Sequence, residues 1–98
     1  MTFKKVSLIV NYEPIQVSGF VQRLIKSVIE SILCSLKEHG EAGNVKLLIN
    51  EDTVEITVGN DTLRLNPFVS NFLKNTVIGM ISSLKGIESV EKLEINIS

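Results

Sequence analysis

The sequence matches itself without a gap when it is displaced by 48 positions. Residues 6–37 and 54–85 share 8 identities over 32 aligned positions, and Phe20 with Phe68 is one of them. Apolar positions of the first unit also meet apolar positions of the second, as Leu8 meets Ile56 and Ile15 meets Leu63. A match of this kind is typical of an internal repeat, whose units bury their apolar faces against each other. It indicates a chain built from two like units, although two units that share a binary pattern by convergence are the alternative.

Each unit has the same predicted order of strand, short strand, helix and strand. The units span residues 6–50 and 54–98 of a single domain, 1–98, and their short strands are expected at 15–17 and 62–65. Alternation of apolar and polar residues predicts the longer strands. The inward-pointing positions of these strands are Val6, Leu8 and Val10, Val45, Leu47 and Ile49, Val54, Ile56 and Val58, and Leu93, Ile95 and Ile97.

Two segments carry apolar residues at helical spacing. The first follows Ser18, whose hydroxyl suits an N-cap, and it stops near Gly40. The second follows Asn66, with Pro67 at its first position, and it stops near Gly86. The predicted buried stripes are Val21, Leu24, Ile25, Val28, Ile29, Ile32, Leu33 and Leu36 in the first helix, and Val69, Phe72, Leu73, Val77, Met80, Ile81 and Leu84 in the second.

These elements predict an α+β fold. Two tandem ββαβ repeats with pseudo-twofold symmetry would form a mainly antiparallel sheet of up to six strands, with both helices on one face. A ferredoxin-like βαββαβ arrangement, in which the short strands are additions, is the alternative. The pattern leaves the order of the strands in the sheet open.

Composition and charge exclude several classes of protein. The chain has 98 residues, is 44% hydrophobic and carries a net charge of −1, which excludes intrinsic disorder. A pI of 5.8 disfavours nucleic-acid binding. The longest charge-free apolar region, residues 75–84, is shorter than the roughly 20 residues that cross a bilayer. The first residues lack the pattern of a signal peptide, so we expect a cytoplasmic protein that does not enter the membrane.

The residues that most often carry chemistry stand alone. Cys34 is the only cysteine, and it lies toward the C-terminal end of the first helix, where the helix dipole disfavours a thiolate. His39 is the only histidine and lies beside Gly40. We therefore expect no catalytic residue, metal site or cofactor. The helix starts at Ser18, Gly19 and Asn66 offer backbone amides to an anion, which is a weak signal because every helix does so.

Surplus apolar surface is the remaining signal. Mean hydropathy is +0.27, and three apolar residues fall on predicted outer faces. Ile9 and Leu48 point away from the predicted core on two strands, and Ile78 lies on the polar side of the second helix. We predict a homodimer and favour the sheet face as its interface. The expected function is a non-catalytic, self-associating interaction module. A sensor or carrier that binds a small ligand between the units is the alternative, and a nucleic-acid-binding protein is a weaker one.

Overall fold

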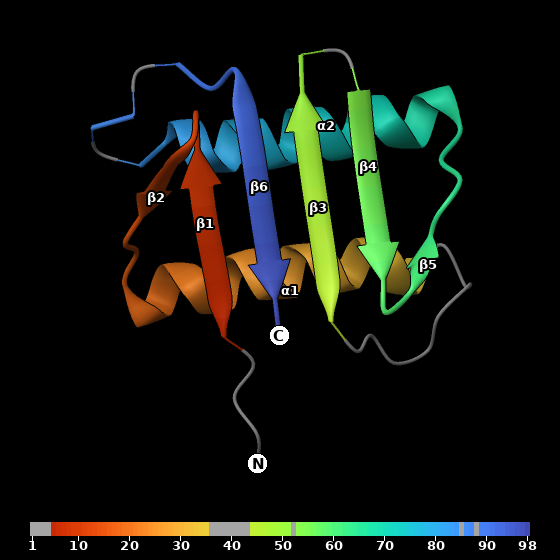
Figure 1. Ribbon diagram of the computed structural model, residues 1–98, viewed down its shortest axis with the longest axis horizontal. Coiled ribbons are helices and arrows are strands. Elements are labelled where there is room, and N and C mark those ends of the chain that lie inside the picture. Colours follow the sequence, from red (N-terminus) through yellow and green to blue (C-terminus); the bar gives the residue numbers. More distant parts are fainter. Residues whose placement is uncertain (1–4, 36–43, 52, 85, 88) are drawn as a thin grey trace.

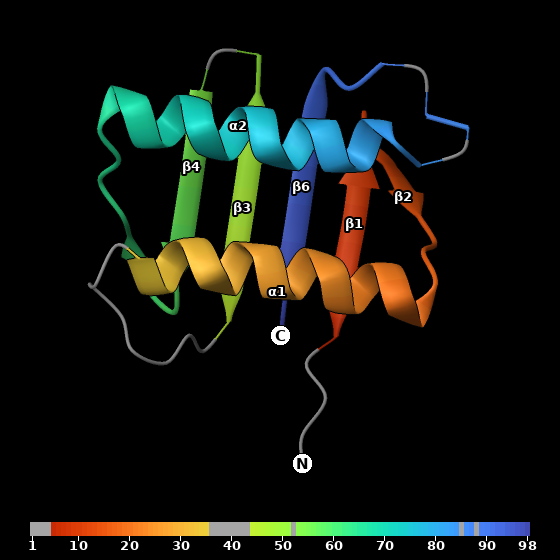
Figure 2. The same ribbon diagram turned by 180° about the vertical axis from the view of Figure 1, so that it is seen from behind.

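The computed structural model describes residues 5–35, 44–51, 53–84, 86–87 and 89–98 of the chain. Two helices cover one face of a six-stranded antiparallel sheet, and the other face of the sheet is open (Figures 1 and 2). The helices run antiparallel to each other and across the strands, so the helix layer extends from one edge of the sheet to the other. The predicted α+β class, the antiparallel sheet and the position of both helices on one face are confirmed.

Eight elements follow one another along the described chain. They are β1 (Val6–Val10), β2 (Glu13–Ile15), α1 (Gly19–Ser35), β3 (Val45–Asn50), β4 (Thr53–Val58), β5 (Asp61–Thr62), α2 (Pro67–Ser82) and β6 (Lys92–Ile97). The order reduces to βαββαβ when the short strands β2 and β5 are set aside. Both short strands differ from their predicted ranges because they pair only beside the turns that lead into them.

The strands lie in the order β2-β1-β6-β3-β4-β5, which the sequence pattern left open. Each helix joins two strands that are not neighbours, because α1 connects β1 to β3 across β6 and α2 connects β4 to β6 across β3. A continuous row of apolar residues crosses the four long strands in register. This row consists of Leu8, Ile95, Leu47 and Ile56.

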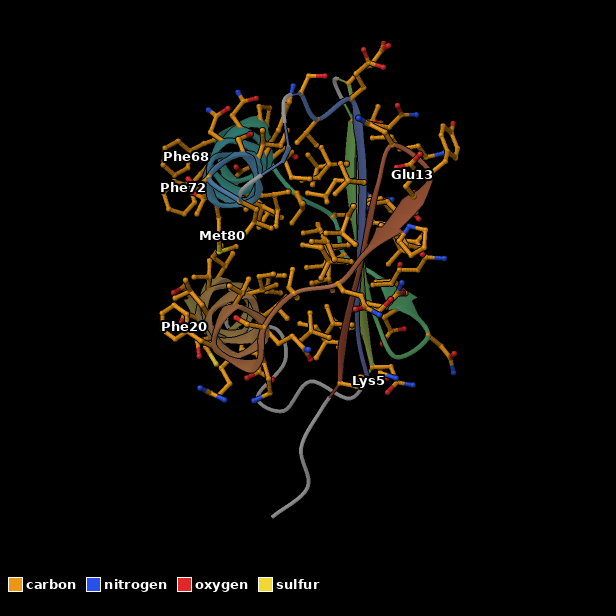
Figure 3. The ribbon with its side chains drawn as sticks, turned by 90° about the vertical axis from the view of Figure 1, so that its left-hand side faces the viewer. Lys5, Glu13, Phe20, Phe68, Phe72 and Met80 are labelled. Atoms are coloured by element: carbon orange, nitrogen blue, oxygen red, sulfur yellow. The ribbon has the colours of Figure 1, made fainter. Side chains whose placement is uncertain are left out.

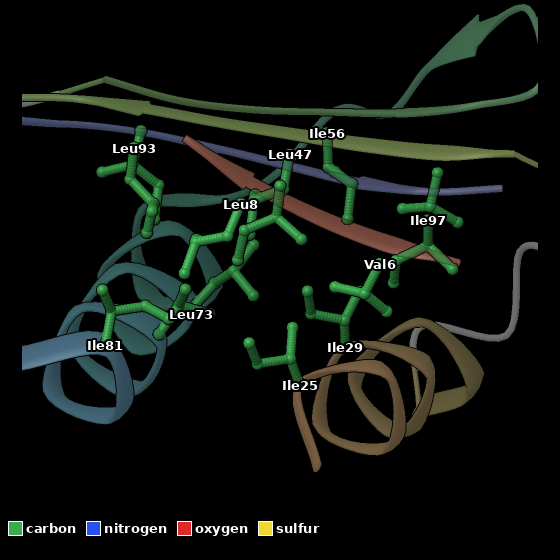
Figure 4. Close-up of a cluster of buried hydrophobic side chains, with 14 of the residues drawn as sticks. Val6, Leu8, Ile25, Ile29, Leu47, Ile56, Leu73, Ile81, Leu93 and Ile97 are labelled. Carbon is green, nitrogen blue, oxygen red and sulfur yellow. The ribbon is translucent and has the colours of Figure 1, made fainter. Parts of the chain in front are cut away.

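The core lies between the sheet and the helices (Figure 4). Every second residue of the long strands points into it, as their alternation predicts. Each helix contributes three buried residues at four-residue spacing, Ile25, Ile29 and Leu33 from α1 and Leu73, Val77 and Ile81 from α2. No polar or charged residue of the described chain is buried. Burial of apolar surface therefore holds the two layers together.

The predicted helix stripes are too wide. Leu24 is 43% exposed and Phe72 is 51% exposed, although both were expected in the core. Successive helical residues are rotated by about 100°, so the residue before Ile25 or Leu73 points away from the sheet. A flat sheet contacts only the narrow row at four-residue spacing, and the rest of the apolar arc remains outside the core.

The predicted helix starts are confirmed. Ser18 Oγ accepts a hydrogen bond from the Val21 amide at 3.3 Å, and Asn66 Oδ1 accepts one from the Val69 amide at 2.8 Å. Helix α2 ends at Ser82, before the predicted stop at Gly86, which has a φ of 91° and turns the chain after the helix. Leu36 and Gly40, at the predicted end of the first helix, lie outside the described residues.

Candidate functional site

The most conspicuous surface feature is a pair of aromatic rings at the start of α2. Phe68 is 75% exposed, and the ring of Phe72, one turn further on, lies with its centroid 6.3 Å from that of Phe68. The planes of the two rings differ by 17°. The Asn66 cap and Pro67 fix the first turn of the helix, so they also fix the direction of Phe68. Both rings point away from the sheet (Figure 3).

A second apolar pair lies at the start of α1. Phe20 is 65% exposed, and Leu24, one turn further on, is 43% exposed. Phe20 also points away from the sheet (Figure 3). The helices are antiparallel, so the two pairs lie toward opposite ends of the helix layer (Figure 2). We call the surface that carries Phe20, Leu24, Phe68 and Phe72 the outer helix face.

Charged residues lie to one side of this surface. In α1, Arg23, Lys26 and Glu30 follow one another at three- and four-residue spacing, which places them on the side of the helix opposite Val28. Lys26 Nζ and Glu30 Oε1 form an ion pair at 3.2 Å. Helix α2 has a single charged residue, Lys74. Met80 lies between the helices (Figure 3), and its side chain packs against the core.

The predicted sheet-face residues lie on the open face but do not touch. Ile9 and Leu48 are both half-buried, and both are paired in register with Glu94 of β6. The Glu94 side chain therefore stands between them, and its carboxylate accepts a hydrogen bond from Asn96 Nδ2 at 2.8 Å. A carboxylate at this position divides the apolar patch that the two residues were expected to form.

The third predicted interface residue, Ile78, is half-buried and packs against the core. It therefore extends the core along one side of α2 and is not brought together with Ile9 or Leu48. The structure separates the three predicted interface residues between two faces of the molecule.

The weak anion-site candidates are occupied by contacts within their own helices. The side chains of Ser18 and Asn66 each accept from a first-turn amide, so that amide is not available to an anion. Gly19 lies beside the Arg23 guanidinium, since a Cβ added to Gly19 would meet Arg23 Nη1 at 3.4 Å. These groups are the ordinary caps of two helices.

Surface hollows lie on the part of the chain that the structure describes. One of about 350 Å³ lies beside the β1–β2 turn and is lined by Val10, Asn11, Glu13, Ile15, Gly86, Ile87 and Ser89. A hollow of about 270 Å³ is lined by residues of β3, β4 and β6. Another, of about 340 Å³, is lined by residues of these strands and of β5. Each of these hollows is lined by residues of both units, so none of them is singled out as the cleft expected for a small-ligand carrier.

A turn at residues 11–14 is predicted from the sequence, but its contacts with the segment that enters β6 are not. Asn11 and Tyr12 both have positive φ values, 49° and 69°. Asn11 Oδ1 accepts hydrogen bonds from the amides of Glu91 and Lys92 at 2.9 Å, and Asn11 Nδ2 donates to the Ser89 carbonyl at 3.0 Å. Asn11 therefore ties the turn to the segment that enters β6. An asparagine in a tight turn was the available signal.

Tyr12 is 77% exposed at the same corner. The ammonium of Lys92 lies 4.6 Å from the centre of the Tyr12 ring, and Lys92 Nζ donates to the Tyr12 hydroxyl at 3.3 Å. Both contacts are with a side chain of β6, so they add to the link that Asn11 makes across this corner.

Cys34 is exposed and has a free thiol, while His39 lies outside the described residues. Among the residues that the structure describes, no group of three or more His, Cys, Asp or Glu side chains is placed to hold a metal ion. Within the same residues, no helix is long and apolar enough to span a membrane. Comparison of the chain with protein-family models, with curated proteins and with solved structures finds no match.

Proposed function

We propose that this protein is a non-catalytic interaction module that associates with itself and is built from two like units. The observation that carries this proposal is the set of large apolar side chains held in solvent on the outer helix face. Four of the five large hydrophobic residues exposed in the described chain lie there. Pairs of large apolar side chains exposed on the same face indicate a surface that another molecule covers.

Strand pairing supports the two-unit part of the proposal. The register between β1 and β6 matches the register between β4 and β3 when the units are exchanged by 48 positions. Leu8 lies opposite Ile95, and its counterpart Ile56 lies opposite Leu47. The short strands follow the same rule, because Ile9 opposite Pro14 corresponds to Thr57 opposite Thr62.

Hydrogen bonds outside the strands support it as well. The Asn11 amide donates to the Lys92 carbonyl, and the Gly59 amide donates to the Asn44 carbonyl, both at 2.8 Å. These bonds are counterparts under the same displacement. So are the two helix caps, Ser18 with Val21 and Asn66 with Val69. A binary pattern of apolar residues does not by itself require matching bonds of this kind, which favours duplication over convergence.

Two like units place two like apolar pairs on one surface. Phe20 and Leu24 are the counterparts of Phe68 and Phe72. Each pair sits in the first turns of its helix, so both are positioned by a capped helix start rather than by a loop. A rigid surface that carries two related anchors suits an interface, because little side-chain and backbone freedom is lost when it is covered.

Sedimentation equilibrium of the wild-type protein tests this function. We expect a dimer or a larger oligomer at micromolar concentration. A thermal-shift screen of nucleotides and small metabolites runs beside it, since a monomer stabilised by one of them would favour the small-ligand carrier. A wild-type protein that stays monomeric at high concentration would contradict the proposed function.

A further inference from the structure

The exposed rings of the outer helix face supply a large part of the area that a stable interface needs. Phe20, Phe68 and Phe72 together expose roughly 400 Å² when a whole aromatic side chain is taken as about 200 Å². A stable interface buries about 800 Å² on each partner. These three rings alone therefore supply about half of that area. Leu24 and the backbone and small side chains between the two pairs are available for the rest.

Among the residues that the structure describes, those exposed between the two apolar pairs carry no charge. They are Ser27 and Ser31 on α1 and Asn75 and Gly79 on α2. Small side chains allow a second surface to approach the helices closely. The surface is also open around Gly79, because a Cβ added to this residue would have no neighbour within 4 Å.

The absence of charge in this space fits one occupant in particular. In a twofold dimer, residues near the axis face their own copies, so a charged residue there would repel itself. The charges that α1 carries, Arg23, Lys26 and Glu30, lie on one side of the helix and away from this space. The net charge of −1 adds little repulsion between two whole chains. The described residues of this space therefore place no like charges against each other when a second copy covers it.

We infer that the outer helix face is covered by the outer helix face of a second copy, about a twofold axis that runs parallel to the two helix layers. The dimer has four layers, with a sheet on each outside and the four helices between them. The two open sheet faces, which carry Glu94, Glu55 and Lys46, remain in water. This inference rests on the proposed self-association and names its surface, which differs from the sheet face favoured by the sequence.

Paired lysine substitutions test whether the outer helix face or the open sheet face forms the dimer interface. Ser31→Lys with Gly79→Lys places two charges on the outer helix face at counterpart positions, and neither change touches the core. We expect a folded monomer, with a dissociation constant raised at least 100-fold. The matched control, Ile9→Lys with Leu48→Lys, places two charges on the open sheet face and should leave the dimer intact. Circular dichroism and thermal unfolding establish that both variants are folded.

Distances between spin labels give a second, independent test. The only cysteine, Cys34, is exposed on α1 and can be labelled in the wild-type chain. With packed layers about 10 Å apart, Cys34 labels on the two copies should lie within roughly 30 Å of each other. Labels at Glu55→Cys in a Cys34→Ser background should lie more than roughly 40 Å apart, because four layers separate them.

The outcomes distinguish the two proposals. A wild-type dimer that Ser31→Lys with Gly79→Lys dissociates supports both. A dimer that resists this variant, or one in which the Glu55→Cys labels are closer than the Cys34 labels, overturns the inference and leaves the proposed function standing. A wild-type monomer overturns both, and the outer helix face would then belong to a different partner.

Discussion

Leu47 of β3 and Ile95 of β6 lie directly opposite each other in the sheet, and neither is exposed to solvent. They are 48 positions apart, so the proposed relation between the units exchanges one residue for the other. A twofold axis that relates the units would pass between these two side chains. The same pair lies in the row of apolar residues that crosses the four long strands, so this point is the middle of both the sheet and the core.

Replacement of Leu47 by alanine should therefore be costly. Truncation of a fully buried leucine leaves a cavity, and we expect the free energy of unfolding to fall by about 2–5 kcal/mol. Leu48 is the matched control, because it is the same residue type on the same strand and points to the open face. Urea unfolding should show a loss for Leu48→Ala that is well below that for Leu47→Ala. Equal losses would mean that the open face of the sheet is covered in solution.

The same comparison applies to α1. Ile29 is buried against the sheet, whereas Leu24 projects from the outer helix face. We expect Ile29→Ala to lower the free energy of unfolding by about 2–5 kcal/mol and Leu24→Ala to lower it by less than about 1 kcal/mol in the monomer. Both values are measured at a protein concentration below that of self-association. A large loss for Leu24→Ala under these conditions would place Leu24 in the core.

Leu24 also marks the limit of what the sequence predicts. The spacing of apolar residues predicts the strands and helices, and the capping residues Ser18 and Asn66 predict where the helices begin. Both signals are local properties of the chain. A hydrophobic stripe does not reveal how much of it a flat sheet can cover, so it predicts Leu24 and Phe72 in the core although both lie on the outer helix face. Strand order depends on pairing between distant segments, and no local pattern encodes it.

The neighbours of the predicted interface residues could not be predicted for the same reason. Alternation predicts that Ile9 and Leu48 point outward, and they do lie on the open face. It does not predict that β6 runs between β1 and β3 and places Glu94 between them. The four residues of the outer helix face were visible in the sequence as two counterpart pairs, but their exposure follows only from the position of the helices on the sheet.

Replacement by alanine should have different effects on stability at Asn66, which caps α2, and at Asn75, in the middle of α2. Asn66 caps the helix through its 2.8 Å bond to the Val69 amide, so Asn66→Ala should lower the free energy of unfolding by about 1 kcal/mol. Asn75 is exposed in the middle of the same helix, where alanine has the higher helix propensity, so Asn75→Ala should be neutral or slightly stabilising. Thermal unfolding of the two variants checks this difference. A loss for Asn75→Ala that matches the loss for Asn66→Ala would contradict the capping role.

Substitutions of Tyr12 distinguish the effect of backbone strain on stability from the effect of the side-chain contacts with Lys92. Its φ of 69° lies in the left-handed region, where residues other than glycine carry a cost of about 1–2 kcal/mol. Tyr12→Ala and Tyr12→Gly both remove the contacts with Lys92, but only glycine relieves the backbone. We therefore expect Tyr12→Gly to be more stable than Tyr12→Ala by about 1 kcal/mol in urea unfolding.

The control for Tyr12 is Gly59, at the turn between β4 and β5. Gly59 has a φ of 62°, and a Cβ added there would have no neighbour within 4 Å. Gly59→Ala should therefore lower the free energy of unfolding by about 1 kcal/mol through the backbone alone. If Tyr12→Ala proves as stable as Tyr12→Gly while Gly59→Ala shows this loss, the β1–β2 turn does not hold Tyr12 in the left-handed region in solution.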